Sequence, residues 1–258
     1  MRVATFNILH GRTVSDGVVD PERLAAAVRE LDPDILALQE VDRDQPRSHF
    51  VDLTTVAAEA MGAVAYRFVP AMSGTPGVAW AAAGAAEVPG EAAYGIALLS
   101  RYPARSWRLS RLPRMPVAFP FYPPGRRRIV RVDDEPRVVV TGCFDTPLGP
   151  LVVATTHLSY LPGWSQLQLR RIGRDLAAVR SPVLILGDLN ETHPTPTTLR
   201  GYRSLARHRT FPAAAPVRQI DHILLRGRLG TVTASRAPEL ALSDHRALVV
   251  ELSETPTP

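Results

Sequence analysis

Residues 184–198, LILGDLNETHPTPTT, begin as an apolar run and end as a polar run rich in proline. The apolar part is typical of a buried strand. Asp188 and Asn190 stand two positions apart where the apolar run ends. If the chain stays extended, side chains two positions apart lie on the same face, so these two are expected to point the same way. A buried strand that ends in such groups predicts a functional site at its exit.

Short apolar runs of the same kind recur along the chain. Their length of roughly five to eight residues and their β-branched content favour strands. They are RVATFNIL (2–9), DILALQE (34–40), YGIALLS (94–100), RRIVRV (127–132), RVVVTG (137–142), LVVATTHL (151–158), PVLILGDLN (182–190), IDHILL (220–225) and RALVVEL (246–252). The runs at 127–132 and 137–142, joined by DDEP, are expected to pair as a hairpin.

Three segments have helical patterns: residues 20–31, 52–61 and 164–180. The first carries Asp20 as N-cap and Pro21 at the first helical position, and the second ends at Gly62, which is a typical C-cap. Strands occur both after helices and in direct succession, so the pattern predicts an α/β fold with a mixed sheet rather than a purely parallel one.

The chain has 258 residues, 45% of them apolar, which is enough for one large α/β domain. We expect a single domain over residues 1–252 and a flexible tail over 253–258. Two long loop-like segments, residues 70–93 and 113–127, are candidates for the rim of a site.

The formal charge is +5 and every basic residue is arginine, because the sequence has no lysine. Such a composition is typical of GC-rich genomes, so the charge is weak evidence for a nucleic-acid partner. The single cysteine, Cys143, excludes an intramolecular disulfide. No leader pattern and no membrane-length apolar run is present, so we expect a cytoplasmic protein, acting as a monomer and without a membrane partner.

Polar residues stand at or near the ends of many predicted strands. They are Asn7, Glu40, His157, Asp188, Asn190, Asp221, Asp244 and His245. Each one alone is explained by a turn or a solvated loop. Together they predict a shared cleft, because the strand ends that meet at one edge of a layered α/β fold are where sites form.

Four of these residues are carboxylates, and they would repel one another in a common cleft. A divalent cation offsets that repulsion. Oxygen donors without a thiolate suit Mg²⁺ or Mn²⁺ better than zinc. A metal ion, carboxylates and imidazoles together can activate water against a phosphate ester.

The ordered motifs TFNILHG, LALQEVDR, YGIALLSRYP, TTHL, GDLN, QIDHILL and LSDHRALVV closely resemble those of the endonuclease/exonuclease/phosphatase (DNase I-like) superfamily. The resemblance covers Met1 to about Leu252. It implies a four-layer sandwich of two mixed β-sheets flanked by helices, with a metal-dependent cleft at one end.

The resemblance also implies roles for the polar set. Glu40 resembles the principal metal ligand, with Asn7 supporting it and Asp244 close to the metal. Asp188 resembles the group that positions or deprotonates the attacking water, and Asn190 a donor to a phosphoryl oxygen.

In the same comparison His245, oriented by Asp221, would contact the scissile phosphate, and His157 would stabilise its charge or assist the leaving group. Asp244 and His245 are adjacent, so they can share a site only if LSDH forms a turn or bulge. His222 alternates with Asp221 and is expected to face away in a structural role.

Four further residues are candidate substrate contacts: His10, Tyr122, Arg126 and Arg127. The chemistry predicted is metal-dependent hydrolysis of a phosphate ester, by a phosphodiesterase or a phosphatase. Two alternatives stay open. One is a nuclease acting on DNA or RNA, and the other is a non-catalytic protein that binds a phosphate ligand on the same scaffold.

Overall fold

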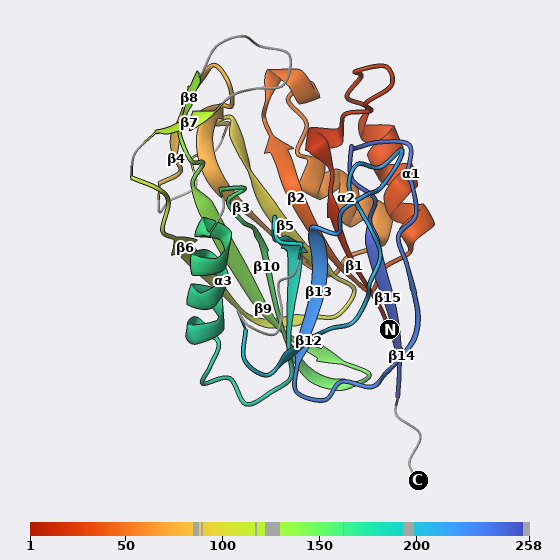
Figure 1. The fold of residues 1–258 in the computed structure, drawn as a ribbon. Coiled ribbons are helices and arrows are strands. Elements are labelled where there is room, and N and C mark those ends of the chain that lie inside the picture. Colours follow the sequence, from red (N-terminus) through yellow and green to blue (C-terminus); the bar gives the residue numbers. More distant parts are fainter. Residues whose placement is uncertain are drawn as a thin grey trace.

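The computed structural model describes residues 1–84, 88, 90–116, 118–121, 130–161, 163–192 and 199–254. Its strands form two large mixed sheets and a two-stranded ribbon (Figure 1). The seven-stranded sheet contains, in spatial order, β14 (Thr231–Arg236), β15 (Leu248–Ser253), β1 (Arg2–Asn7), β2 (Ile35–Arg43), β5 (Ala93–Ser100), β3 (Ala65–Thr75) and β4 (Ala79–Ala82).

The six-stranded sheet contains, in spatial order, β12 (Tyr202–Ser204), β13 (Asp221–Arg226), β11 (Val183–Asp188), β10 (Gly149–His157), β9 (Arg137–Thr146) and β6 (Ala104–Leu112). Strands β7 (Phe119–Phe121) and β8 (Val130–Val132) form the ribbon. The pairs β1–β2 and β10–β11 are parallel and the other pairs are antiparallel, as the mixed-sheet prediction requires.

Three apolar clusters hold four layers together. The central cluster joins the inner faces of the two sheets, for example through Val3 and Leu98 of one sheet and Val153 and Leu186 of the other. A second cluster packs helices α1 (Pro21–Leu31) and α2 (Leu53–Met61) on the outer face of the seven-stranded sheet, and a third packs α3 (Trp164–Asp175) on the six-stranded sheet. This arrangement confirms the predicted four-layer sandwich.

The helices begin and end where the sequence predicts, with one exception. The Asp20 carboxylate accepts a hydrogen bond from the Glu22 amide at 2.9 Å, and Asp52 caps α2 in the same way. Helix α2 ends at Gly62, whose φ of 68° places it in the left-handed region. Helix α3 ends at Asp175 instead of continuing to residue 180, and residues 176–178 form turns.

The predicted hairpin between residues 127–132 and 137–142 is wrong. Strand β8 pairs with β7, whereas β9 pairs with β6 and β10. The connection between β8 and β9 is fixed elsewhere, because the Asp134 carboxylate accepts hydrogen bonds from the Ser159 hydroxyl at 2.7 Å and the Met115 amide at 3.0 Å. The DDEP segment, which resembles a hairpin turn in the sequence, therefore connects the two-stranded ribbon to the six-stranded sheet.

The segment 70–93, predicted as a loop, contains the end of β3 and the whole of β4, which pair as a hairpin. Its glycines and alanines hide the strand pattern in the sequence. No helix in the described part of the chain is long and apolar enough to cross a membrane. Strand β15 extends to Ser253, and the tail prediction for the last residues lies mainly outside the described residues.

Candidate active site

Strand register brings three of the predicted polar residues into one row. In the six-stranded sheet His157 pairs with Asp188 across β10 and β11, and Asp188 pairs with Asp221 across β11 and β13. The other sheet contributes Asn7 from the end of β1, and the Asn7 Nδ2 atom donates to Asp188 Oδ2 at 3.1 Å. The two sheets therefore meet at this row of side chains.

Glu40 reaches the same place because β2 is irregular there. The pairing of β2 with β5 shifts between Gln39 and Val41, and Glu40 has a φ of 58°. Such a bulge turns one side chain out of the regular alternation of the strand. The Asn7 Nδ2 atom also donates to Glu40 Oε1 at 3.0 Å, so one amide group links Glu40 with Asp188.

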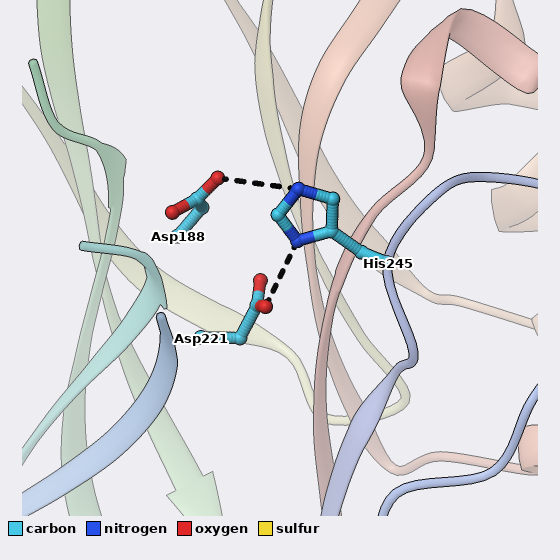
Figure 2. Close-up of side chains that lie close together, drawn as sticks. All are labelled: Asp188, Asp221 and His245. Carbon is cyan, nitrogen blue, oxygen red and sulfur yellow. Dashed lines mark hydrogen bonds and ion pairs between the residues drawn. The ribbon is translucent and has the colours of Figure 1, made fainter. Parts of the chain in front are cut away.

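Asp188, Asp221 and His245 form a compact buried cluster (Figure 2). The Nδ1 atom of His245 lies 2.9 Å from Asp221 Oδ2, and its Nε2 atom lies 3.7 Å from Asp188 Oδ2. Asp221 is fully buried, and its other oxygen, Oδ1, has no hydrogen-bond partner among the described residues. The imidazole is thus held between two carboxylates.

The segment that carries His245 is a turn, which satisfies the condition set by the adjacent Asp244 and His245. Ser243 has a φ of 72°, its hydroxyl donates to Asn7 O at 2.6 Å, and it accepts the His245 amide at 3.0 Å. Asp244 is more exposed than His245, and its Oδ1 atom lies 4.0 Å from His245 Nε2. Both side chains therefore belong to one site.

Burial and neighbouring charges shift the pKa values in this cluster. Burial, together with the Asp221 charge, raises the pKa of Asp188 to about 7. Burial lowers the pKa of His245, but the carboxylates of Asp221, Asp188 and Asp244 outweigh it and raise the pKa to about 10. At neutral pH the imidazole of His245 is therefore a cation.

His157 has the opposite character. Its Nε2 atom lies 3.5 Å from Asp188 Oδ2. Burial, the Arg137 guanidinium and the His245 charge hold the pKa of His157 well below its ordinary value. At neutral pH its imidazole is neutral, with one nitrogen as a donor and the other as an acceptor.

Asn190 lies beside the cluster in a conformation that the sequence did not predict. Strand β11 ends at Asp188, and Asn190 has a φ of 50°, so the chain does not stay extended. The Asn190 amide donates to Asp188 Oδ1 at 3.0 Å, and its Nδ2 atom donates to Leu158 O at 2.9 Å. This local turn, which asparagine and aspartate favour, fixes both the Asp188 carboxylate and the Asn190 side chain.

Of the remaining residues singled out in the sequence, two are histidines that the structure describes and three lie outside the described residues. His10 lies in the 3-10 helix η1 (Leu9–Gly11), where burial, Arg47 and Arg12 lower its pKa to about 4. His222 faces away from Asp221 and contacts Glu191 O at 2.7 Å through Nε2, as expected for a structural role. The predicted substrate contacts Tyr122, Arg126 and Arg127 lie outside the described residues.

Sequence reasoning missed four residues around the cluster, namely Tyr94, Glu135, Arg137 and Phe211. Arg137 is 5% exposed and pairs with Glu135 at 3.0 Å, and its Nε atom has no hydrogen-bond partner in the described part of the chain. Tyr94 is buried, and burial followed by the charge of Glu40 raises its pKa. The Phe211 ring lies 4.9 Å from the His245 ring. Only the alternating Glu135 and Arg137 gave a signal, namely two opposite charges at the start of a strand.

Two places at the junction of the two sheets have the chemistry of a divalent-metal site. Possible ligand atoms of Asp188, Asp221 and His245 lie within 4.8 Å of one another, but His245 is cationic and bonded to Asp221. Glu40 is the second place. Burial is the largest cause and raises the pKa of Glu40. The Asn7 hydrogen bond and the His245 charge lower this pKa, and the charges of Glu135 and Asp244 raise it. Carboxylate and amide oxygens are donors that fit Mg²⁺ or Mn²⁺.

A family model described as the Endonuclease/Exonuclease/phosphatase family matches residues 4–245. The chain belongs to this family. Family members are hydrolases that act on phosphate esters. A search of the curated proteins returned no match.

Several solved structures share this fold over nearly the whole chain. An endonuclease/exonuclease/phosphatase from Beutenbergia cavernae is 27% identical, with a TM-score of 0.72 over 99% of this chain and 72% of that one. The human Nocturnin catalytic domain with bound sulfate is 20% identical (TM-score 0.64, 99% and 94% covered). A mannosyl-6-phosphatase from Bacteroides thetaiotaomicron is 17% identical (TM-score 0.62, 98% and 99% covered). The last two likenesses establish the fold alone.

Proposed function

We propose that this family member is a divalent-metal-dependent phosphate ester hydrolase that uses Asp188 to activate water. The observation that carries the proposal is the position of the Asp188 carboxylate. It lies where the two sheets meet, within 3.1 Å of Asn7 Nδ2 and within 3.7 Å of both histidines. A carboxylate with a pKa of about 7 is a suitable general base at neutral pH.

Each neighbour of Asp188 has a distinct task in this mechanism. The Asp188 carboxylate accepts a proton from the attacking water as the oxygen of that water approaches phosphorus. Cationic His245, held by Asp221, stabilises the negative charge that grows on the phosphoryl oxygens. Neutral His157 offers an N–H group to the same oxygens or to the departing ester oxygen.

Asn190 and Glu40 complete the set. One hydrogen of Asn190 Nδ2 is bonded to Leu158 O, which leaves the second for a phosphoryl oxygen. Glu40 would hold the metal ion, with Asn7 positioning its carboxylate and Asp244 nearby. When bound, Mg²⁺ or Mn²⁺ supplies Lewis-acid polarisation of the phosphoryl group.

The proposed substrate is a phosphate ester. A phosphodiester or phosphomonoester is the leading candidate, nucleic acid is the alternative, and His10, Tyr122, Arg126 and Arg127 are proposed to contact the substrate. Action in the cytoplasm as a monomer stays a prediction from the sequence. A protein that binds phosphate ligands without turnover would keep the same fold.

One experiment separates these functions. Purified protein is incubated with bis-p-nitrophenyl phosphate and p-nitrophenyl phosphate, with Mg²⁺, Mn²⁺ or a chelator, and then with DNA, RNA, phosphoinositide and sphingomyelin. Metal-dependent release of nitrophenol that Asp188→Asn abolishes supports the proposal. Binding of inorganic phosphate without turnover of any substrate would instead favour the non-catalytic alternative.

A further inference from the structure

A pocket of about 610 Å³ lies between helix α3 and strand β12, away from the catalytic cluster. Four arginines line it, Arg170, Arg174, Arg200 and Arg226, together with the apolar side chains of Leu199 and Tyr202. Among the described residues that line it, none is acidic. Pockets that hold small organic molecules have volumes of roughly 300–1,000 Å³, so its size suits one such molecule.

The pocket and the catalytic cluster occupy opposite ends of one strand. Strand β13 begins at the catalytic Asp221 and ends at Arg226, which lines the pocket. At ~3.3 Å per residue, the two ends are roughly 17 Å apart. Helix α3 packs on the face of the six-stranded sheet that points away from the other sheet, and β12 is the edge strand of the same sheet (Figure 1). A ligand here would not contact the scissile phosphate.

One arginine of the pocket is fixed by hydrogen bonds. The Nη2 atom of Arg226 donates to Leu176 O at 2.9 Å and to Val179 O at 2.8 Å, just beyond the end of α3. Its guanidinium carbon also lies 5.5 Å from the centre of the Tyr202 ring. Arg226 therefore provides an ordered cationic edge to the pocket before any ligand binds.

The other three arginines carry charge that the described residues leave uncompensated. Arg170 and Arg174 stand one helical turn apart on α3, where like charges repel. Within the described part of the chain, no ion pair is formed by Arg170, Arg174 or Arg200. Arg171 differs, because it pairs with Asp175 at 3.1 Å and does not line the pocket. An anion in the pocket would relieve the repulsion.

The floor of the pocket is apolar. Gly173 allows Leu199 to lie directly on the helix, since a Cβ atom at position 173 would come within 2.5 Å of Leu199 Cδ2. The Tyr202 ring is buried, and its hydroxyl has no hydrogen-bond partner within the described residues. An apolar floor below a cationic rim suits a molecule with an apolar body and a charged end.

We infer that this pocket binds a small organic anion, in which a phosphate, sulfonate or carboxylate group is attached to an aromatic or otherwise apolar body. Guanidinium groups pair with such anions through two parallel N–H bonds. The body of the ligand lies on Leu199 and Tyr202, and the anionic group faces Arg170 and Arg174. Cationic ligands are repelled by the same rim.

The probe for this site is 1-anilinonaphthalene-8-sulfonate, an aromatic anion of suitable size. Its binding is titrated by fluorescence at moderate salt for two matched pairs of variants. Ala177→Trp fills the pocket, whereas Ala178→Trp adds the same ring at an exposed position outside the lining. Arg174→Gln removes a rim charge, and Arg171→Gln removes a charge from the same helix outside the pocket.

We expect saturable binding to the wild type, at least tenfold weaker binding to Ala177→Trp, and severalfold weaker binding to Arg174→Gln, with both controls close to the wild type. Equal effects within each pair would overturn the site. Thermal unfolding checks each variant, and Arg174→Gln still tests the site if Ala177→Trp does not fold. The neutral N-phenyl-1-naphthylamine should bind at least tenfold more weakly than the sulfonate. Equal affinity would overturn the preference for anions.

Discussion

Asn7 and Asp188 join the two sheets through one hydrogen bond, in which Asn7 Nδ2 donates to Asp188 Oδ2 at 3.1 Å. The two residues are 181 positions apart in sequence, and both are at most 2% exposed. The same Nδ2 group also reaches Glu40, so the proposed base and the proposed metal ligand share one donor. Changes at Asp188 and Glu40 therefore test separate functions within one connected group.

Replacement of Asp188 by asparagine should abolish most of the turnover. The change is nearly isosteric and removes the charge that accepts the proton, so we expect kcat to fall by ~10²-fold or more with KM little changed. The measurement is metal-dependent hydrolysis of bis-p-nitrophenyl phosphate. A variant that keeps more than about a tenth of the wild-type rate would remove Asp188 from the chemistry, since loss of a base costs ~10²-fold or more.

The metal-free protein should become less stable as the pH rises towards neutrality. The pKa of Asp188 is about 7 in the folded state and near 3.8 in the unfolded state, so folding favours its protonated form. This contribution is fully present below pH 3.8 and is lost as the pH rises through 7. We expect the free energy of unfolding to fall by at least ~1 kcal/mol between pH 5 and pH 7.5.

Urea denaturation in the presence of a chelator at several pH values measures this change. Asp188→Asn cannot ionise, so the loss of stability should be much smaller in that variant. Parallel curves for the two proteins would mean that another group titrates. His245 contributes in a higher range, because its folded-state pKa of about 10 makes its contribution disappear only above pH 6.5.

Glu40→Gln should weaken metal binding and activity together. The variant keeps the shape of the side chain but removes the negative charge that attracts a divalent cation. Calorimetric titration with Mn²⁺ should show at least tenfold weaker binding, and the concentration of Mn²⁺ needed for half-maximal activity should rise in parallel. The control is Glu22→Gln on the exposed side of α1. A Glu40 variant with wild-type Mn²⁺ affinity would exclude Glu40 as a ligand.

The sequence predicted the parts of this site that follow from strand patterns. Asp188 and Asp221 stand at the ends of clear apolar runs, and strand register then places them opposite each other. The sequence did not predict that β8 pairs with β7 instead of β9. The connection after β8 is held by a hydrogen bond from Ser159 to Asp134, which lies 25 positions away. Such long-range hydrogen bonds leave no local periodicity.

The same limit applies to residues that surround the cluster. Phe211 lies in FPAAAP, a segment that reads as a loop, and only the folded chain brings its ring against His245. Glu40 was predicted as a strand-end residue, but its position depends on a bulge that no residue type announces. Sequence reasoning therefore missed Phe211, whose place depends on a tertiary contact, and it predicted Glu40 without the bulge that positions its side chain.

Phe211→Leu should impair catalysis without unfolding the protein. The Phe211 ring lies 4.9 Å from the His245 ring and restricts its orientation. A contact of this kind is worth ~0.5–1.5 kcal/mol, so we expect kcat to fall roughly 2- to 10-fold. The His245 ring resonances in an NMR spectrum should also shift. Phe50→Leu, at a ring that is 65% exposed, is the matched control and should change neither. Unchanged His245 resonances in Phe211→Leu would remove this positioning role.

Removal of the Arg137 charge should raise the pKa of His157. Burial is the largest cause of the low pKa of this imidazole, and the Arg137 guanidinium is the next. In Arg137→Gln the second cause disappears, so the pKa should rise, while burial keeps it below the ordinary value of 6.5. Histidine titration by NMR on labelled protein measures this pKa directly.

Two variants serve as controls for this prediction. Arg137→Lys keeps the positive charge and should leave the pKa of His157 close to that of the wild type. Arg228→Gln, at an exposed position, controls for the change in net charge. An equal rise in the glutamine and lysine variants would show that the shape of Arg137, and not its charge, keeps His157 neutral.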